Sequence, residues 1–391
     1  MLNYRFYNPT RIIFGRGEEQ NAGKYAAQYG KKVLLHYGGG SAVRSGLLDR
    51  VKDSLESEGM DVTLLGGVKP NPRLSMVLKG AEICRQKGIE VILAVGGGSV
   101  IDSAKGIAIA AKLDGDVWEY YMDSAKQCEI KETLPVGVVL TIPAAGSESS
   151  TGSVVTNEET GMKRFIDIEL NIPKFAILNP ELTFTLGAYQ TACGAYDMLS
   201  HLMERYFTNV TDTDLTDRLI EATARTIIHN TPKVINDPEN YNARAEIMQS
   251  GTIAHNGLLD CGRLGDWASH NIGMELSGKY DSIHGETLSV ITPAWMKYVH
   301  NCNIDRFVQF GQRVFGIDFE PSDKEAIFEE LIKRLTSWGT SVGLPVRLSQ
   351  LDIGNEHFEE MAHKCIINRG YVGELKQLAE SDIVEIFKLA L

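Results

Sequence analysis

Residues 91–105 read VILAVGGGSVIDSAK, and the order of residue types in this stretch is typical of an α/β fold. Its apolar first half predicts a strand buried on both faces, as in a parallel sheet, and its second half predicts a helix. The turn between them, Gly96 to Gly98, predicts a pyrophosphate site, because glycines let backbone N–H groups approach phosphate oxygens and a helix N-terminus adds partial positive charge. The order GGGSxxDxxK is not the GxGxxG fingerprint, and a glycine triplet alone is more often a plain tight turn.

The same alternation of strand and helix runs through the first half of the chain. Strand-like runs open the segments 31–41, 61–72 and 89–99, helical patterns follow at 42–58, 73–87 and 100–112, and further strand-like runs lie at 134–142, 154–168 and 175–179. From Leu186 onward the periodicity is helical, at 187–207, 214–230, 240–259, 263–277, 285–299, 303–315, 322–342 and 355–366. We therefore predict an α/β dinucleotide-binding domain with a Rossmann-like parallel sheet at 1–185 and an all-α domain at 186–391.

Two more segments suit a dinucleotide. One of them is a second glycine turn, made of Gly38, Gly39, Gly40 and Ser41. It follows a predicted strand and lies one βα unit before the turn of Gly96 to Gly98, at the place where the adenosine ribose is expected. No carboxylate stands there to bind the 2′-hydroxyl of NAD, and Ser41 offers a donor to a 2′-phosphate, so NADP(H) is favoured and NAD(H) is the alternative. TIPAAGSESS (141–150) carries hydroxyl and carboxylate groups suited to the ribose and nicotinamide. A plain turn and a polar loop are the competing interpretations of these two segments.

Four potential metal ligands lie in the predicted helical domain. Asp197 and His201 in AYDMLSHLMERYF (195–207) are four residues apart, so both leave one face of a helix. His270 and His284 lie on one predicted helix and at the start of the next. Together they suit Fe²⁺ or Zn²⁺, although each residue alone is more often structural. The other histidines are interpreted as structural or surface residues: His36, His229, His255, His300, His357 and His363.

Composition excludes several classes of function. The formal net charge of −12 over 391 residues argues against a nucleic-acid partner. The first residues lack the apolar core of a secretory signal, and no charge-free run reaches the length of a membrane span. The six cysteines form no CxxC pair, which favours reduced thiols and a cytoplasmic protein.

These motifs, taken in order, resemble the iron-containing (group III) alcohol dehydrogenase family, close to its butanol dehydrogenases and broad-range aldehyde reductases. The resemblance is carried by YNPTRIIFGRG (7–17), YGGGS (37–41), KPNP (69–72), VGGGSVID (95–102), TIPAAGSES (141–149), ETGMKRF (159–165), AYDMLSH (195–201) and the histidines of 270–286. It implies a metal held by Asp197, His201, His270 and His284. It also implies cofactor contacts from Gly97, Gly98, Ser99, Asp102, Asn71, Thr141, Ser147, Ser150, Lys163 and Leu182. An active site between the two domains and a homodimer are expected as well.

The chain departs from the family at two positions. Relatives commonly carry a histidine four residues after the third ligand, thought to help move the proton, and this chain has Met274 there. Ala145 stands where relatives often have threonine. With the relay histidine missing, Asp102 is our candidate catalytic residue.

The predicted function is therefore metal-dependent, NAD(P)-linked oxidoreduction of small aliphatic alcohols and aldehydes, such as butanol and butyraldehyde. In this chemistry the metal is a Lewis acid and the dinucleotide carries the hydride. Three alternatives stay open: a polyol dehydrogenase of the glycerol type, a cyclising synthase of the same fold, and a catalytically impaired nucleotide-binding relative.

Overall fold

The structure is a computed structural model that describes residues 1–320 and 322–391. The chain folds into two compact units, Tyr7–Thr185 and Leu186–Leu391, and Met1–Phe6 pack with the second of them. The Leu2 N–H donates a hydrogen bond of 2.9 Å to the Gly262 carbonyl, which ties the first residues to that unit. The predicted ranges are 1–185 and 186–391, and this division into two domains stays a prediction.

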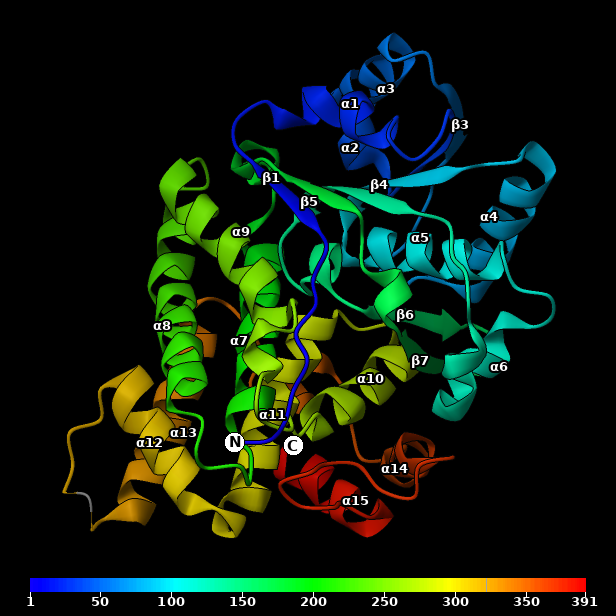
Figure 1. The fold of residues 1–391 in the computed structure, drawn as a ribbon. Coiled ribbons are helices and arrows are strands. Elements are labelled where there is room, and N and C mark those ends of the chain that lie inside the picture. Colours follow the sequence, from blue (N-terminus) through cyan, green and yellow to red (C-terminus); the bar gives the residue numbers. More distant parts are fainter. Residues whose placement is uncertain (321) are drawn as a thin grey trace. The chain divides into compact units, whose positions relative to one another are not determined.

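The first unit is built on a six-stranded parallel sheet (Figure 1). Its strands are β1 (Arg11–Phe14), β2 (Lys32–Tyr37), β3 (Asp61–Leu65), β4 (Val91–Gly97), β5 (Val136–Ile142) and β8 (Phe175–Leu178), in the order β1-β8-β5-β4-β2-β3. Its helices are α1 (Ala22–Ala26), α2 (Gly40–Arg44), α3 (Leu47–Ser57), α4 (Leu74–Lys87), α5 (Gly98–Ala110) and α6 (Val117–Met122). The predicted α/β class with a parallel sheet is confirmed.

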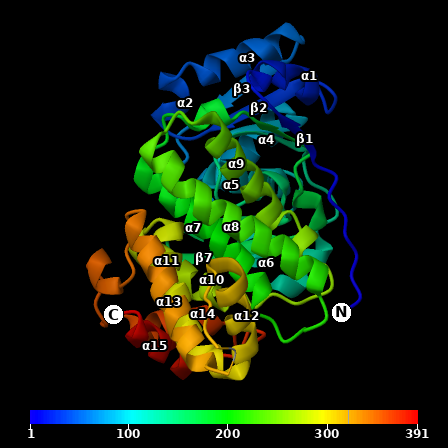
Figure 2. The ribbon, with the colours of Figure 1, turned by 90° about the vertical axis from the view of Figure 1, so that its left-hand side faces the viewer.

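Alternate residues of the central strands face opposite sides of this sheet, so both faces carry helices. Val91, Leu93 and Val95 of β4 share one hydrophobic core with residues of α1 and α3. On the other face, the His36 ring of β2 lies 2.9 Å from the Ser103 hydroxyl of α5. Figures 1 and 2 show α1 and α3 on one side of the sheet and α4 and α5 on the other.

The structure also contains α1, α6 and α15, which the sequence patterns did not predict, and it differs from those patterns at three further places. The helical pattern at 42–58 is divided into α2 and α3 by Gly46, whose φ of 67° favours glycine. The run 154–168 forms no part of the main sheet, because β6 (Gly152–Asn157) and β7 (Met162–Asp167) pair with each other as an antiparallel hairpin. Strand β1 escaped prediction because RIIF is only four residues long and begins with Arg11.

The second unit is helical, as predicted. Its helices are α7 (Ala188–Tyr206), α8 (Asp214–Asn236), α9 (Tyr241–His255), α10 (Ala268–Tyr280), α11 (His284–Val299), α12 (Ile304–Phe315), α13 (Lys324–Ser341), α14 (Phe358–Ile366) and α15 (Glu380–Leu389). Every residue from Thr191 to Tyr206 is buried. A helix buried all round lies at the centre of its domain. Accordingly, α7 packs against α8, α9 and α11 (Figure 2).

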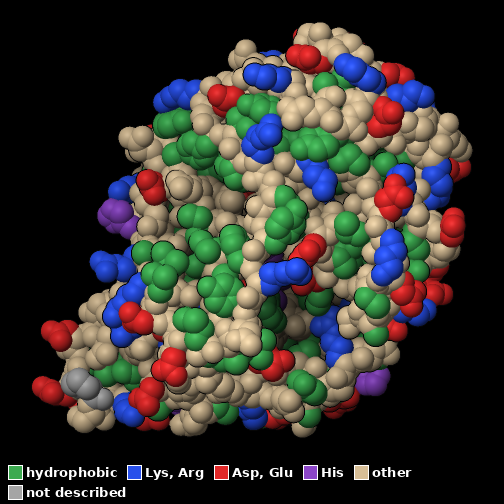
Figure 3. Space-filling model, viewed as in Figure 1, with side chains coloured by type: hydrophobic (Ala, Val, Ile, Leu, Met, Phe, Trp, Pro, Cys, Tyr) green, Lys and Arg blue, Asp and Glu red, His purple; other side chains and the backbone are tan. Residues whose placement is uncertain are grey.

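The face of the molecule drawn in Figure 3 carries hydrophobic as well as charged side chains. On the face drawn in Figure 3, Lys and Arg side chains are interspersed with Asp and Glu. Among the helices of residues 1–320 and 322–391, none is long and apolar enough to cross a bilayer.

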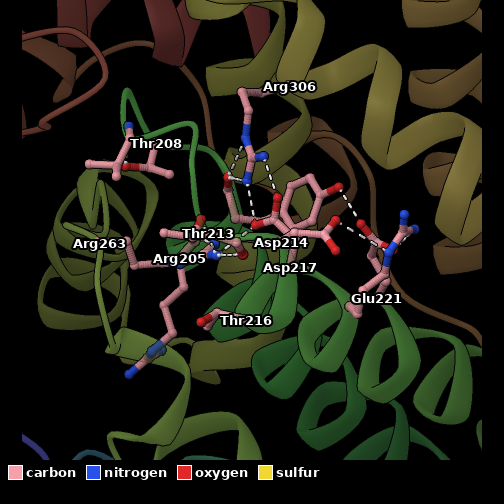
Figure 4. Close-up of polar contacts among 12 residues, drawn as sticks. Arg205, Thr208, Thr213, Asp214, Thr216, Asp217, Glu221, Arg263 and Arg306 are labelled. Atoms are coloured by element: carbon pink, nitrogen blue, oxygen red, sulfur yellow. Dashed lines mark hydrogen bonds and ion pairs between the residues drawn. The ribbon is translucent and has the colours of Figure 1, made fainter. Parts of the chain in front are cut away.

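A buried ion network joins α8 to α12 and to the segment before α10 (Figure 4). The Asp217 carboxylate accepts hydrogen bonds from Arg263 at 2.6 Å and from Arg306 at 2.7 and 2.9 Å. Gln309 donates a further hydrogen bond to it at 3.0 Å. Burial alone raises the pKa of a carboxyl group, but the two guanidinium groups outweigh it and hold the pKa of Asp217 below its usual range. Asp217 is therefore charged and fully paired at neutral pH.

We expect Asp217→Asn to lower the free energy of unfolding of the helical unit by about 3 kcal/mol, because two buried guanidinium groups lose their counter-charge. Denaturant unfolding followed by circular dichroism measures the change. Asp214→Asn is the matched control, since Asp214 lies on the same helix with a side chain 78% exposed, and its effect should stay below about 0.5 kcal/mol. Equal unfolding midpoints for the two variants would contradict the prediction.

Candidate metal centre and dinucleotide site

The four predicted metal ligands converge within the helical unit. Asp197 and His201 lie one turn apart on the buried face of α7, His270 lies in the first turn of α10, and His284 is the first residue of α11. Asp197, His201 and His270 are each less than a tenth exposed, and their ligand atoms form a compact group. Three helices that are separate in sequence thus bring their side chains to one point.

The donor atoms are arranged around a shared centre. The Nε2 atoms of His201 and His270 each lie 3.8 Å from Oδ1 of Asp197, and Nε2 of His284 lies 4.0 Å from it. These distances are too long for hydrogen bonds. They approach the spacing of about 3.4 Å that tetrahedral bonds of about 2.1 Å give to a zinc-type ion. Within the described part of the chain, Oδ1 of Asp197 and Nε2 of His270 have no hydrogen-bond partner although both atoms are buried. The residues therefore fit a divalent cation.

The electrostatics of the cluster favour metal binding. Burial, assisted by the neighbouring His255 and His270, holds the pKa of His201 well below its usual range, so this ring is neutral at pH 7 and keeps a lone pair for a metal. Burial acts in the same direction on His270, but the Asp197 and Glu204 carboxylates outweigh it and raise the pKa of that ring. A cation bound here would face one carboxylate and at least one imidazole, that of His201, which is neutral at pH 7.

The predicted dinucleotide residues gather at one edge of the sheet. Gly38 to Ser41 follow β2, Gly97 ends β4 and is followed directly by Gly98 and Ser99 of α5, and Thr141 lies near the end of β5. These three strands are parallel neighbours, so their carboxyl ends lie at the same edge. The strand order also changes direction between β2 and β4. From β2 the chain continues outward to β3 at one edge of the sheet, and from β4 it continues to β5 on the opposite side. Such switch points are where open α/β sheets bind ligands.

Close packing explains the glycines of the central turn. A Cβ at Gly97 would lie 2.7 Å from Cβ of Ile142, and a Cβ at Gly98 would lie 3.2 Å from Cβ of Ala145. Larger residues would push the turn away from the end of β5. Ala145, one of the two departures from the family pattern, therefore lies against the glycine turn itself.

Behind this turn, α5 is tied to the polar segment after β5. Asp102 accepts a hydrogen bond from the Ser147 hydroxyl and one of 3.2 Å from the Val154 N–H. Lys105 donates hydrogen bonds of 2.8 Å to the carbonyls of Ser150 and Gly152. Burial raises the pKa of Asp102 and lowers that of Lys105 to about 8. These contacts hold the loop in place.

The three remaining cofactor candidates belong to segments of the chain other than the glycine turns. Lys163 of β7 donates a hydrogen bond of 2.9 Å to Oδ1 of Asn71, and both residues are 5% exposed. Leu182 lies in the short helix Pro180–Thr183 and packs against the core between the sheet and α3. Their contact with a cofactor stays a prediction.

Comparison with protein families accounts for nearly the whole chain. Residues 9–180 match the model described as iron-containing alcohol dehydrogenase, and residues 191–391 match that of the C-terminal part of the Fe-containing alcohol dehydrogenase family. The chain belongs to the iron-containing alcohol dehydrogenase family. It is an alcohol/aldehyde oxidoreductase that uses a metal and a nicotinamide dinucleotide.

Individual relatives agree with this assignment. A probable NADH-dependent butanol dehydrogenase of Bacillus subtilis is 45% identical over 391 residues, which is 100% of both chains. An NADPH-dependent aldehyde reductase of Escherichia coli is 35% identical over 93% of each chain. The crystal structure of an NADH-dependent butanol dehydrogenase from Thermotoga maritima superposes with a TM-score of 0.95 at 38% identity, covering 99% of this chain and 98% of the other. The family is therefore established by sequence and by fold.

In this iron-containing alcohol dehydrogenase, the residues near the sites that the sequence did not indicate include His255 and Arg44. His255 was interpreted as structural or surface, but its ring centroid lies 4.2 Å from that of His201. A terminal guanidinium nitrogen of Arg205 lies 3.3 Å from Nδ1 of His255. The central carbon of the same guanidinium lies 4.6 Å from the centroid of the Trp267 ring. Since arginine only donates, Nδ1 of His255 accepts the hydrogen bond. His255 is the last residue of α9 and lies outside the sequence segments that carry the predicted ligands. No residue spacing therefore links it to them.

Arg44 was missed as well. It ends α2, and its guanidinium occupies the space in which a side chain on Gly40 would lie. A positive charge thus stands over the turn of Gly38 to Ser41. The sequence carried a signal here, since Arg44 follows Ser41 by one turn of a helix.

Proposed function

We propose that this dehydrogenase interconverts small aliphatic aldehydes and alcohols, such as butyraldehyde and butanol, by hydride transfer with a nicotinamide dinucleotide. The observation that carries the proposal is the convergence of three imidazole nitrogens on one buried oxygen of Asp197. The names of the relatives, two butanol dehydrogenases and an aldehyde reductase, support the substrate class.

Asp197, His201, His270 and His284 would hold the divalent ion, which we propose to be Fe²⁺, with Zn²⁺ as the alternative. When bound, the ion supplies Lewis acidity, which lowers the pKa of an alcohol or polarises the carbonyl of an aldehyde. The protein itself holds the ligand side chains in place. Burial of α7 fixes Asp197 and His201 in a dry environment, and it keeps His201 in the neutral form that binds metals.

We further propose that Gly97, Gly98 and Ser99 bind the pyrophosphate. Asp102 is buried and accepts hydrogen bonds from the loop after β5, so these contacts favour a role in positioning that loop over the proton transfer considered from the sequence. Met274 has no titratable group and is 7% exposed. The proton therefore follows a route that does not use this side chain.

For the cofactor, we propose a preference for NADP(H) over NAD(H). The turn of Gly38 to Ser41 has no carboxylate to repel a 2′-phosphate, and the guanidinium of Arg44 lies over it. The relatives do not decide the matter, because the name of one gives NADPH and the names of two give NADH. The preference thus depends on the residues of this turn.

Two further proposals concern the state of the protein in the cell. We propose a homodimer, as is usual in the family, and a cytoplasmic location. All six cysteines are free thiols, which supports a reducing compartment. Analytical ultracentrifugation of the metal-loaded protein tests the dimer.

Reduction of butyraldehyde, followed by the loss of NADPH or NADH absorbance, tests the proposed reaction. The protein is stripped of metal and reloaded without oxygen with Fe²⁺ or Zn²⁺. We expect cofactor oxidation only after reloading, and faster oxidation of NADPH. Dinucleotide binding without turnover on either metal would favour the catalytically impaired alternative. Glycerol oxidation that exceeds butanol oxidation would favour the polyol alternative.

A further inference from the structure

We propose that Glu204 is a positioning residue of the metal centre, which orients His270 and raises its affinity for the cation. The inference rests on the proposed metal site and adds a residue to it. Glu204 lies on α7 with Asp197 and His201, at the seventh position after Asp197, and so on the same face of the helix. It is 1% exposed.

One oxygen of Glu204 holds both the backbone and the ring of His270. Oε1 accepts hydrogen bonds from Nδ1 of His270 at 2.8 Å, from its backbone N–H at 2.9 Å and from the Ser269 hydroxyl at 2.6 Å. Helix α10 begins after Trp267, which provides no side-chain cap. The N–H groups of a first helical turn need partners outside the helix. Glu204 supplies one of them from α7, so the position and the rotation of the His270 ring are fixed together.

This contact also selects the tautomer of His270. A carboxylate only accepts, so Nδ1 of His270 carries the hydrogen and Nε2 presents its lone pair toward Asp197 when the ring is neutral. The negative charge of Glu204 makes the ring a stronger donor to a cation. His201 differs, because its Nδ1 atom is buried and has no hydrogen-bond partner within residues 1–320 and 322–391. Of the two rings, only His270 is oriented by a carboxylate.

Cobalt titration tests the proposal, since Co²⁺ bound to imidazole and carboxylate ligands absorbs visible light. In metal-free protein, we expect Glu204→Gln to raise the Kd for Co²⁺ by about 10- to 100-fold and to shift the absorption band, with an unchanged circular dichroism spectrum. Ser269→Ala is the matched control, because it removes one hydrogen bond to the same oxygen and leaves the ring contact in place. Its Kd should change by less than about threefold.

The outcomes separate this inference from the proposed metal site. A wild-type protein that binds no Co²⁺ would overturn the site itself. Tight binding by the wild type with an equal Kd in Glu204→Gln, or an equal loss in Ser269→Ala, would overturn the role of Glu204 alone. If Glu204→Gln does not fold, ¹⁵N-histidine NMR of the Zn²⁺-loaded wild type replaces it. Protonated Nδ1 on His270 is expected there, and protonated Nε2 would overturn the inference.

Discussion

The Asp197→Ala variant should bind neither Fe²⁺ nor Zn²⁺ and should lose roughly a thousandfold or more in kcat for butyraldehyde reduction. The reason is the position of one oxygen. Oδ1 of Asp197 is the atom on which His201, His270 and His284 converge, and its carboxylate is the only charge that these four ligands offer a cation. Elemental analysis after dialysis measures the metal, and a steady-state assay measures kcat.

Dinucleotide affinity should survive in the same variant, because the glycine turns belong to the α/β unit and Asp197 to the helical unit. Fluorescence titration with NADPH checks this. Asp305→Ala is a suitable control, since the Asp305 side chain is 70% exposed and forms a surface ion pair with Lys324 at 2.7 Å. A full complement of metal, or near-normal turnover, in Asp197→Ala would remove this residue from the proposed centre.

Gly39→Asp should reverse the cofactor preference, with a change of about 100-fold in the ratio of kcat/KM for NADPH to that for NADH. A carboxylate at this position would repel a 2′-phosphate and accept hydrogen bonds from the 2′-hydroxyl of NAD. The backbone tolerates the change: Gly39 has a φ of −73°, and nothing lies within 4 Å of a Cβ built there. The effect should therefore be electrostatic and not steric.

The neutral isostere Gly39→Asn separates charge from size. We expect it to keep a preference for NADPH, with at most a few-fold change in the ratio, because it adds the same volume without the charge. Steady-state kinetics with both cofactors at one ionic strength provides the comparison, since screening weakens the repulsion. Equal ratios for the wild type and Gly39→Asp would place the 2′-position of the ribose away from Gly38 to Ser41.

The sequence predicted those parts of the molecule that depend on patterns within a short stretch of residues. The buried run before Gly96 gave β4 and its turn into α5, and the four-residue spacing placed Asp197 and His201 on one face of α7. Strand β1 was missed because four residues carry too little periodicity. The break at Gly46 was missed because the hydrophobic pattern continues across it.

The rest of the site depends on contacts that no local pattern encodes. Glu204 lies 66 residues before its partner His270, and nothing near either residue signals the pair. The approach of His255 to His201 follows from the packing of α9 against α7. The four-ligand set was predictable only because its members could be matched to a family. Without the family, sequence position related only Asp197 to His201 and His270 to His284, and it did not join the two pairs.

The division of the chain into two units also has an evolutionary consequence. The turn proposed to choose between NADP(H) and NAD(H) lies in Tyr7–Thr185, and the residues proposed to hold the metal lie in Leu186–Leu391. A lineage can therefore move from one electron pool of the cell to the other by changing a few residues between Gly38 and Arg44, without altering any side chain of the metal cluster. In this architecture, the choice of cofactor and the metal chemistry can therefore change independently during evolution.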